Sequence, residues 1–299
     1  AAVSENGVHV AGNFQWWSPG STPLNDSDGD GIIDGLDLCE GTSSTAQIVN
    51  SSGCEIPVLY LENVTESSLG TPTLKAAEGA EIGMQYYILG DTYTIVNETQ
   101  LRNMVQNGED ISFVVTSKVT DMSELFKNHN FSNNNYQYLL ARWDVSNVTN
   151  MASMFQGSTY NADLSGWDTG NVTDMSYMFN NPNHDGGFNM ELHTWDVSSV
   201  TYMYSMFEGS SFNQDISSWD VSNVTEMAFM FKSSPFNQDI SSWDVSSVTR
   251  TSSMFDYTPF NQPIGNWDVS SVNDMGFMFS GAYNFNQPIG NWDVSSVTR

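Results

Sequence analysis

The sequence predicts an α/β repeat protein in which coils of about 24 residues, each a short strand plus a short helix, stack into a solenoid. A Trp-Asp-Val-Ser string recurs, lightly edited, from about residue 119 to residue 299, and its tryptophans are mostly twenty-four residues apart. Most copies are followed by Met-x-x-Met-Phe. Because one coil is too small to bury its own apolar face, neighbouring coils must share a core. The tryptophans predicted to lie in that core are Trp143, Trp167, Trp195, Trp219, Trp243, Trp267 and Trp292.

Each repeat carries apolar residues at fixed distances from its tryptophan. In the copy at residues 212–231, Phe212 lies seven residues before Trp219, Ile216 lies three before it and Val224 lies five after it. The Ile-x-x-Trp-x-Val part suits a short extended segment. The Met-x-x-Met-Phe part, with a valine one turn earlier, has the spacing of a short α-helix or 3-10 helix that buries one face. We therefore interpret the methionine and aromatic stripe as core and not as a cofactor site.

Two polar residues also recur. An asparagine follows the repeat aromatic in most copies, and stacked asparagine side chains can satisfy turn amides along the coils. An aspartate follows each motif tryptophan, and like charges on coils about 4.8 Å apart repel by roughly 3 to 4 kcal/mol at an effective dielectric of about 20. We expect Ser or Thr hydroxyls and backbone N–H groups to offset this repulsion, and the alternative is a stripe that binds cations or substrate.

The repeats differ in length at one place, between the phenylalanine of Met-x-x-Met-Phe and the next aromatic residue. This interval is normally five residues, but it lengthens to ten from Phe126 to Tyr136 and to nine from Phe179 to Phe188. Insertions confined to one loop project from one edge of a solenoid, where repeat proteins often bind, although drift in loop length without function is an equal alternative. The candidate ligand-contact residues are Asn133, Asn134, Asn135, Asn181, Asn183, His184 and Asp185.

The chain before the repeats is predicted to contain four segments. Residues 1–24 form a strand and linker, residues 25–54 a calcium-binding loop module, residues 55–83 a connection with a strand or two, and residues 84–118 a cap for the solenoid 119–299. A stack of coils needs such a cap because its first coil would otherwise expose apolar residues.

The predicted cap has clear local signals. Two strand-like stretches surround a Gly-Asp turn at residues 90–91. Asn97 then begins a helix with Gln100 at its third position, which is the pattern of a capping box, and the helix should end at Gly108. A further strand is expected within residues 111–116.

Residues 26–37 have the spacing of a calcium-binding loop, with carboxylates at positions one, three, five, nine and twelve and glycine at six. Alternate side chains converge on one centre in such a loop. An aspartate stands at position twelve in place of the usual glutamate and no helices flank the loop, so weaker affinity than in a sensor protein is expected. A solvated acidic linker is the lesser alternative, since the carboxylates would repel one another without a cation. The expected Ca²⁺ ligands are Asp26, Asp28, Asp30, the backbone carbonyl of Ile32, Asp34 and Asp37.

The only two cysteines, Cys39 and Cys54, bracket a loop rich in Ser, Thr and Gly. We expect them to pair, which implies an oxidising, extracytoplasmic setting. The aspartate-rich loop followed at once by Cys39 resembles the thrombospondin type 3 calcium repeats that serve as spacers in bacterial surface proteins. That resemblance implies that the aspartates wrap Ca²⁺ and that a Cys39–Cys54 disulfide closes the turn.

Over residues 119–299, the strings Trp-Asp-Val-Ser-Asn-Val-Thr-x-Met-x-x-Met-Phe and Phe-Asn-Gln resemble the surface-protein repeat of BspA-like leucine-rich-repeat proteins of bacteria. The lead-in, with its Tyr-Thr-Ile-Val string at residues 93–96, is also similar. The resemblance implies a leucine-rich-repeat-like solenoid in a secreted or surface-anchored protein, used for adhesion or other protein and glycan contact. It supplies no shared catalytic residues.

Composition narrows the function classes further. A net charge of −27 repels nucleic acids and anionic membranes, and no apolar run is long enough for a membrane helix. The four histidines stand at unrelated repeat positions, and the chain has no nucleophile elbow, phosphate loop or histidine metal cluster. We therefore predict that the protein is not an enzyme.

The predicted function is that of a bacterial adhesin or binding module, secreted or at the cell surface, with Ca²⁺ rigidifying its N-terminal spacer. Its expected partners are surface proteins or glycans of a host or neighbouring cell. The alternative is a structural subunit or stalk of an extracellular filament that self-associates, and a non-catalytic part of a larger secreted enzyme is less favoured. Because the sequence ends within a repeat and no signal peptide opens it, we expect a mature or trimmed start, further repeats and an anchoring domain.

Removal of Ca²⁺ should disorder the segment at residues 26–38, because its carboxylates repel one another without a cation. Thermal melting followed with and without a chelator measures this effect. The calcium site would be refuted by a melt in which chelation causes no loss of order in that segment.

Overall fold

In a computed structural model of the protein, the described residues are 48–49, 55–56, 59–62, 73–76, 79–88, 91–131, 138–183 and 187–299. They fall into two compact units. The first comprises Ala1–Val119 with Arg142–Asp144, and the second comprises Thr120–Ala141 with Val145–Arg299. The predicted calcium ligands and both cysteines lie outside the described residues, so the calcium loop and the disulfide stay predictions.

The first unit contains short strands in antiparallel pairs. Strand β1 (Ile48–Val49) pairs with β2 (Glu55–Ile56), and β3 (Leu59–Glu62) pairs with β4 (Thr73–Ala76). These strands lie in and just before the stretch for which the sequence indicated a connection with a strand or two.

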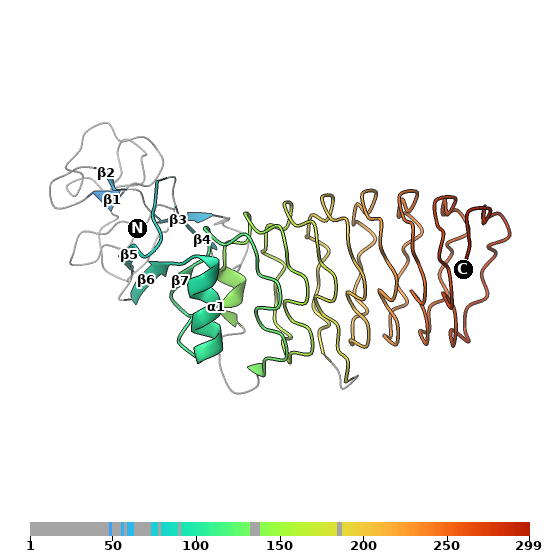
Figure 1. Ribbon diagram of the computed structural model, residues 1–299, viewed down its shortest axis with the longest axis horizontal. Helices are drawn as coiled ribbons and strands as arrows, with labels where there is room; N and C mark the ends of the chain where they lie inside the picture. Colours follow the sequence, from blue (N-terminus) through green and yellow to red (C-terminus); the bar gives the residue numbers. More distant parts are fainter. Residues whose placement is uncertain are drawn as a thin grey trace, which may run out of the picture. The chain divides into compact units, whose positions relative to one another are not determined.

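The third sheet of this unit has three strands, and the one α-helix among the described residues lies between two of them in the chain. Strands β5 (Gln85–Ile88) and β6 (Asp91–Ile95) form an antiparallel hairpin, and β7 (Val114–Val115) adds to β6 in parallel. Helix α1 (Glu98–Asn107) makes the crossover that a parallel pair requires (Figure 1). The strand, helix and strand predicted within residues 84–118 are therefore confirmed, whereas the capping role of that segment stays a prediction.

The ends of α1 follow the local signals in the sequence. The N–H of Gln100 donates to Oδ1 of Asn97 at 2.9 Å, and the N–H of Asn97 donates to Oε1 of Gln100 at 3.1 Å. This reciprocal pair is the predicted capping box. Gly108 ends the helix with φ of 68°, a left-handed conformation that glycine adopts without a Cβ penalty.

The second unit is a row of coils that lie side by side, from green to red in Figure 1. One residue of each coil forms a parallel β-bridge with the equivalent residue of the next coil. We call it the bridge residue and count positions in a coil from it. The coils stack in register, but the assignment of this stack to a leucine-rich-repeat-like class stays a prediction. The bridge residues are Asp121, Asn150, Asp174, Tyr202, Glu226, Arg250 and Asp274.

The Met-x-x-Met-Phe segment is a run of β-turns and not the short helix that its spacing predicted. The N–H of Met154 donates to the carbonyl of Met151 at 3.1 Å, which closes a turn within the coil. Alternate N–H groups donate to the next coil instead, as from Ser153 to the carbonyl of Ser176 at 2.7 Å. A helix would use those donors internally, and the coils would lose the bonds that join them. Turns and helices both return a side chain to one face after three residues, so the spacing alone did not separate them.

The core of the second unit is built from stacked aromatic rings. Phe231 stacks on Phe236 of its own coil with 3.9 Å between ring centroids, and on Phe207 and Phe255 of the neighbouring coils at 5.9 Å. Every coil repeats this arrangement with small variations. The apolar columns of the sequence therefore become continuous ring stacks along the unit.

The motif tryptophans are hydrogen-bonded within this core. Each indole N–H donates to the carbonyl of the aliphatic residue in the preceding coil, as from Trp243 to Ile216 at 3.1 Å. The bond satisfies the one polar atom of a large apolar side chain. The same bond is made by Trp167, Trp195, Trp219, Trp267 and Trp292. Trp143 is buried in the first unit, and Trp292 is half-buried in the last coil.

One coil departs from the repeat at its first position. Thr251 stands where the other coils carry methionine, and it is only 2% exposed. Its hydroxyl has no hydrogen-bond partner among the described residues. An unsatisfied buried hydroxyl destabilises the folded state, because on folding it loses its hydrogen bonds to water and gains none within the protein.

The variant Thr251→Val should raise the free energy of unfolding by about 1 kcal/mol, because valine has the same shape and no hydroxyl. Thr258→Val is the matched control, since the Thr258 hydroxyl donates to the carbonyl of Phe255 at 2.8 Å. This control should lower the free energy of unfolding by about 1 to 2 kcal/mol. Guanidinium titration measures both, and equal destabilisation by the two substitutions would contradict the assignment.

Candidate functional site

The recurring asparagine column joins the coils, as predicted. The N–H of Asn213 donates to Oδ1 of Asn189 in the preceding coil at 2.9 Å. Nε2 of Gln214 donates to the carbonyl and to Oδ1 of the same Asn189, both at 3.1 Å. This column is occupied by bonds within the protein and offers little to a ligand. The pattern repeats at Asn237, Asn261 and Asn286.

The recurring aspartate column is held by the serines that follow it. Oδ1 of Asp220 accepts from the N–H of Ser222 at 3.1 Å and from its hydroxyl at 2.6 Å. These bonds hold the pKa of Asp220 below its usual value, against burial and the neighbouring Asp196, which act to raise it. The predicted offset by serine and backbone donors is therefore confirmed. The pKa is lowered by serine in the same way at Asp196, Asp244, Asp268 and Asp293.

The first aspartate of that column is different. Asp144 is 3% exposed, and its Oδ1 lies 3.8 Å from Nζ of Lys75. A lysine within the first unit, in strand β4, thus faces this buried carboxylate. Pairing of this kind keeps a buried charge from being uncompensated.

The insertion loops are only partly within the described residues. Asn133, Asn134, Asn135, His184 and Asp185 lie outside them. Asn181 is 5% exposed, and its Oδ1 accepts from the N–H of Asn183 at 3.2 Å, so its side chain supports the loop from inside. Asn183 is exposed. Ligand contact by these loops stays a prediction.

A different surface carries the residues that change from coil to coil, and their side chains range from exposed, as at Phe277, to buried, as at Ser205 and Ser253. It consists of the bridge residues and of the second, third and sixth positions after them, and we call it the turn face. Its side chains are those that vary within and after Met-x-x-Met-Phe, whereas the asparagine, aspartate and tryptophan columns are nearly constant. The sequence did not single out these positions, because they carry neither a recurring residue nor an insertion.

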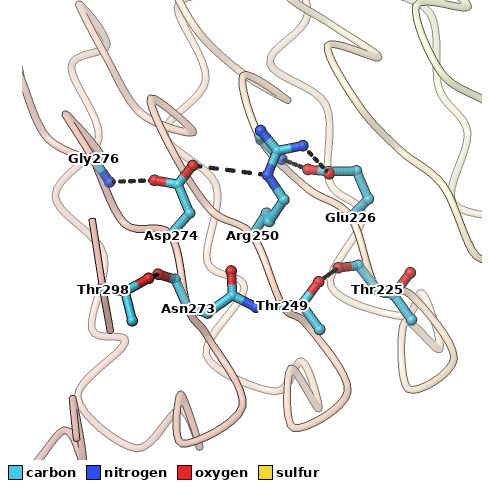
Figure 2. A network of polar contacts seen from close by, with 9 residues as sticks. Thr225, Glu226, Thr249, Arg250, Asn273, Asp274, Gly276 and Thr298 are labelled. Atoms are coloured by element: carbon cyan, nitrogen blue, oxygen red, sulfur yellow. Dashed lines mark hydrogen bonds and ion pairs between the residues drawn. The ribbon is translucent and has the colours of Figure 1, made fainter. Parts of the chain in front are cut away.

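Charges on the turn face are paired across coils. Figure 2 shows Arg250 between Glu226 and Asp274 of the adjacent coils. Its Nη1 donates to Oε2 of Glu226 at 2.9 Å, and its Nε lies 3.8 Å from Oδ2 of Asp274. A row of backbone and hydroxyl bonds runs beside it, as from the hydroxyl of Thr249 to the carbonyl of Thr225 at 2.9 Å. Arg250 thus offsets part of the negative charge of Glu226 and Asp274.

An aromatic cluster lies on the same face, built from three successive coils. The ring of Tyr204 lies 5.0 Å from that of Tyr177 and 5.3 Å from that of Phe229. Nζ of Lys232 lies 5.1 Å from the Phe229 ring centroid and 3.4 Å from Oε1 of Glu208. This ammonium group therefore makes both a cation–π contact and a salt bridge. Burial and a hydrogen bond with Tyr204, together with nearby acidic groups, raise the pKa of Tyr177 to about 12.

Several aromatic residues of the turn face adopt an unfavourable backbone conformation. The third position has positive φ in every coil from Asp121 to Asp274. Serine occupies it in three coils, but Tyr177, Phe229 and Phe277 have φ of 59°, 62° and 59°. Residues with a Cβ lose about 1 to 2 kcal/mol there. Phe277 is moreover 77% exposed, so burial in the core does not compensate for that cost.

Among the described residues, no three His, Cys, Asp or Glu side chains lie together so that they could hold a metal ion. No helix within the same residues is both long and apolar enough to cross a bilayer. Paired charges, hydroxyl groups and exposed rings can contact another molecule over several coils.

A family model described as "Mycoplasma protein of unknown function, DUF285" matches residues 97–209, 183–258 and 236–299. The chain belongs to this family. The DUF285 region begins at Asn97, the N-cap of α1, and continues through the coils to residue 299. No curated protein and no solved structure matches the chain.

The serine bonds of the DUF285 coils predict a pH effect. The variant Ser246→Ala removes the hydroxyl that donates to Oδ1 of Asp244 at 2.6 Å, and the pKa of Asp244 should rise toward 3.8. Because the folded pKa is below the unfolded one, the stabilisation is present above about pH 4 and is lost as the pH falls through the folded pKa. A carboxyl NMR titration measures the pKa, with Ser246→Thr as the control that keeps a hydroxyl. An unchanged Asp244 titration in Ser246→Ala would contradict the assigned cause.

Proposed function

We propose that this protein is a non-catalytic adhesin or binding module, secreted or displayed at a bacterial cell surface, whose coils form a BspA-like leucine-rich-repeat solenoid. The turn face is its contact surface in this proposal. Support comes from the difference between the recurring polar residues of the coils and the variable residues of the turn face. The asparagine column is occupied by bonds between coils and most of the aspartate column by bonds to the following serines, whereas exposed side chains of the turn face such as Tyr202 and Phe277 remain available to a partner.

One observation carries the proposal: Phe277 is an exposed aromatic residue in a left-handed conformation, whereas Tyr177 and Phe229 at the same position are half-buried. Serine satisfies the same backbone position in the coils of Asn150, Tyr202 and Arg250. The fold therefore does not require an aromatic residue there, and Phe277 gains little burial in return for its conformation. Residues that are strained and exposed without benefit to folding are typical of binding surfaces.

The N-terminal segment has a separate part in the proposal. The aspartate-rich loop at residues 26–37 would bind Ca²⁺, with the cysteines closing the turn, and would stiffen the chain that precedes the DUF285 region. Its support is the carboxylate spacing in the sequence. A stiff spacer holds a contact surface away from the cell that displays it.

Adhesion of beads coated with the full chain to a panel of eukaryotic and bacterial cells tests this function. The triple variant Tyr204→Ala, Phe229→Ser, Phe277→Ser should reduce bead attachment at least tenfold, because it removes three of the five aromatic rings of the turn face. Tyr283→Ala is the matched control, since Tyr283 is 90% exposed but lies outside the positions that define the turn face. Retained attachment of the triple variant, or no attachment of the unmodified chain to any cell in the panel, would contradict the proposal.

A further inference from the structure

Two pairs of neighbouring coils place a phenylalanine at the third position of the turn face and a carboxylate at the sixth position of the coil before it. In the first pair, these residues are Phe229 and Glu208. In the second pair, they are Phe277 and Asp256. Both phenylalanines have a left-handed backbone, with φ of 62° and 59°. The two pairs of coils therefore compare different side chains at equivalent positions.

The same backbone bond joins the coils of each pair. The N–H of Gly209 donates to the carbonyl of Lys232, and the N–H of Tyr257 donates to the carbonyl of Ser280, both at 2.8 Å. Lys232 and Ser280 are the sixth-position residues of the two phenylalanine coils. These two residues therefore stand at the same place on the backbone, and only their side chains differ.

In the first pair, an ammonium group joins the ring to the carboxylate. Nζ of Lys232 lies 5.1 Å from the Phe229 ring centroid and 3.4 Å from Oε1 of Glu208. A cation is attracted both by the face of an aromatic ring and by a carboxylate. The protein itself therefore shows which chemical group such a pair of coils holds.

In the second pair, the ammonium group is missing. Ser280 stands where the first pair has Lys232, and it carries no charge. Asp256 is only 8% exposed, and its Oδ1 is buried without a hydrogen-bond partner. Among the described residues, its carboxylate takes part in no salt bridge. A carboxylate so far removed from water destabilises the folded state unless a cation or a donor offsets the loss.

Two exposed aromatic residues border this carboxylate. Phe277 is 77% exposed, and Tyr257, which follows Asp256 in the chain, is 63% exposed. The Tyr257 ring lies over Gly281, because a Cβ on that glycine would be 2.7 Å from Cδ1 of the ring. Ser280 thus has one exposed ring three residues before it and another over the residue after it. Both rings are on the surface, so a cation can contact them without entering a cavity.

The charges around Asp256 favour a cation from outside the chain. Lys232, in the coil before Asp256, is held by Glu208, and Arg250, in the same coil as Asp256, is held by two other carboxylates. Neither basic residue forms a salt bridge with Asp256 in the part of the chain that the structure describes. The net charge of −27 also attracts cationic partners from a distance.

We propose that Asp256, Phe277 and Tyr257 bind the ammonium group of a lysine side chain on a partner protein. This ammonium takes the place that Lys232 has in the first pair, and the aliphatic part of the partner's lysine lies against the exposed rings. The occupant of the first pair is itself a lysine, which is why we assign a lysine to the second. The inference rests on the proposed binding function, and it names the partner as a protein with exposed lysine residues.

The variant Ser280→Lys tests the geometry by copying Lys232 into the second pair. Its melting temperature should be about 1 to 2 °C above that of Ser280→Met, the matched control of similar length without a charge, because the new ammonium pairs with Asp256. The difference should disappear in about 1 M salt, where the screening length is about 3 Å. Equal melting temperatures of the two variants at low salt would overturn the inference.

The binding probe is the peptide acetyl-Gly-Lys-Gly-amide, titrated into the full chain with carbon-13 in its phenylalanine rings and aspartate carboxyl groups. The peptide should shift the NMR signals of Phe277 and Asp256, and the same peptide with an acetylated lysine should not. Asp256→Asn should weaken binding at least tenfold, and Ser280→Lys should abolish it because the place is filled. No shift of either signal, equal shifts with the acetylated peptide, or unchanged binding by Ser280→Lys would each contradict the proposal.

Bead attachment separates this inference from the binding function on which it rests. Beads coated with Ser280→Lys should attach to cells at least tenfold less than beads coated with the unmodified chain. Acetylation of the lysine residues on the cell surface should reduce attachment of the unmodified chain by a similar factor. If both changes leave attachment as it was while the triple variant still reduces it, the binding function stands and the lysine site is refuted.

Discussion

The backbone hydrogen bonds between coils are the constraint on which the second unit depends. Alternate N–H groups of each turn run donate to the next coil, and this fixes the register of every position along the stack. Each side chain then faces its own equivalent in the neighbouring coil. A column of identical residues is stable only if the residue can pair with itself, and aromatic rings, asparagine amides and threonine hydroxyls all meet that condition.

Charged residues do not meet that condition, and the two charged columns solve the problem differently. In most of the aspartate column, the carboxylate is bonded to the serine two residues later, so the repulsion between coils is offset within those coils. In the bridge column, the sign of the charge changes from Glu226 to Arg250 to Asp274, and attraction acts between coils (Figure 2). The repulsion between coils is therefore offset by serine bonds in one column and by an ion pair in the other.

The sequence predicted best what is either local or strictly periodic. The capping box at Asn97 depends on two side chains within four residues, and the asparagine and aspartate columns repeat in nearly every coil, so the chemistry of each could be worked out without coordinates. The prediction of a short helix was wrong because a spacing of three residues fits β-turns as well as helices. Hydrogen bonds to a coil about 24 residues away favour the turns over the helix. The turn face was missed because its side chains differ between coils, as Tyr204 and Ser252 do at equivalent positions.

Register also explains why binding residues can change here without loss of the fold. An asparagine side chain in the column accepts from the next coil, as Oδ1 of Asn213 accepts from the N–H of Asn237, so its replacement breaks a bond between coils. A residue at the third position takes part in the ladder through its backbone, and its side chain ranges from buried, as at Ser205, to exposed, as at Phe277. Serine, tyrosine and phenylalanine all occupy that position with nearly the same φ, between 52° and 62°. The coil thus keeps one backbone path while the surface above it varies, and this separation of scaffold from surface lets a repeated chain present a face that does not repeat.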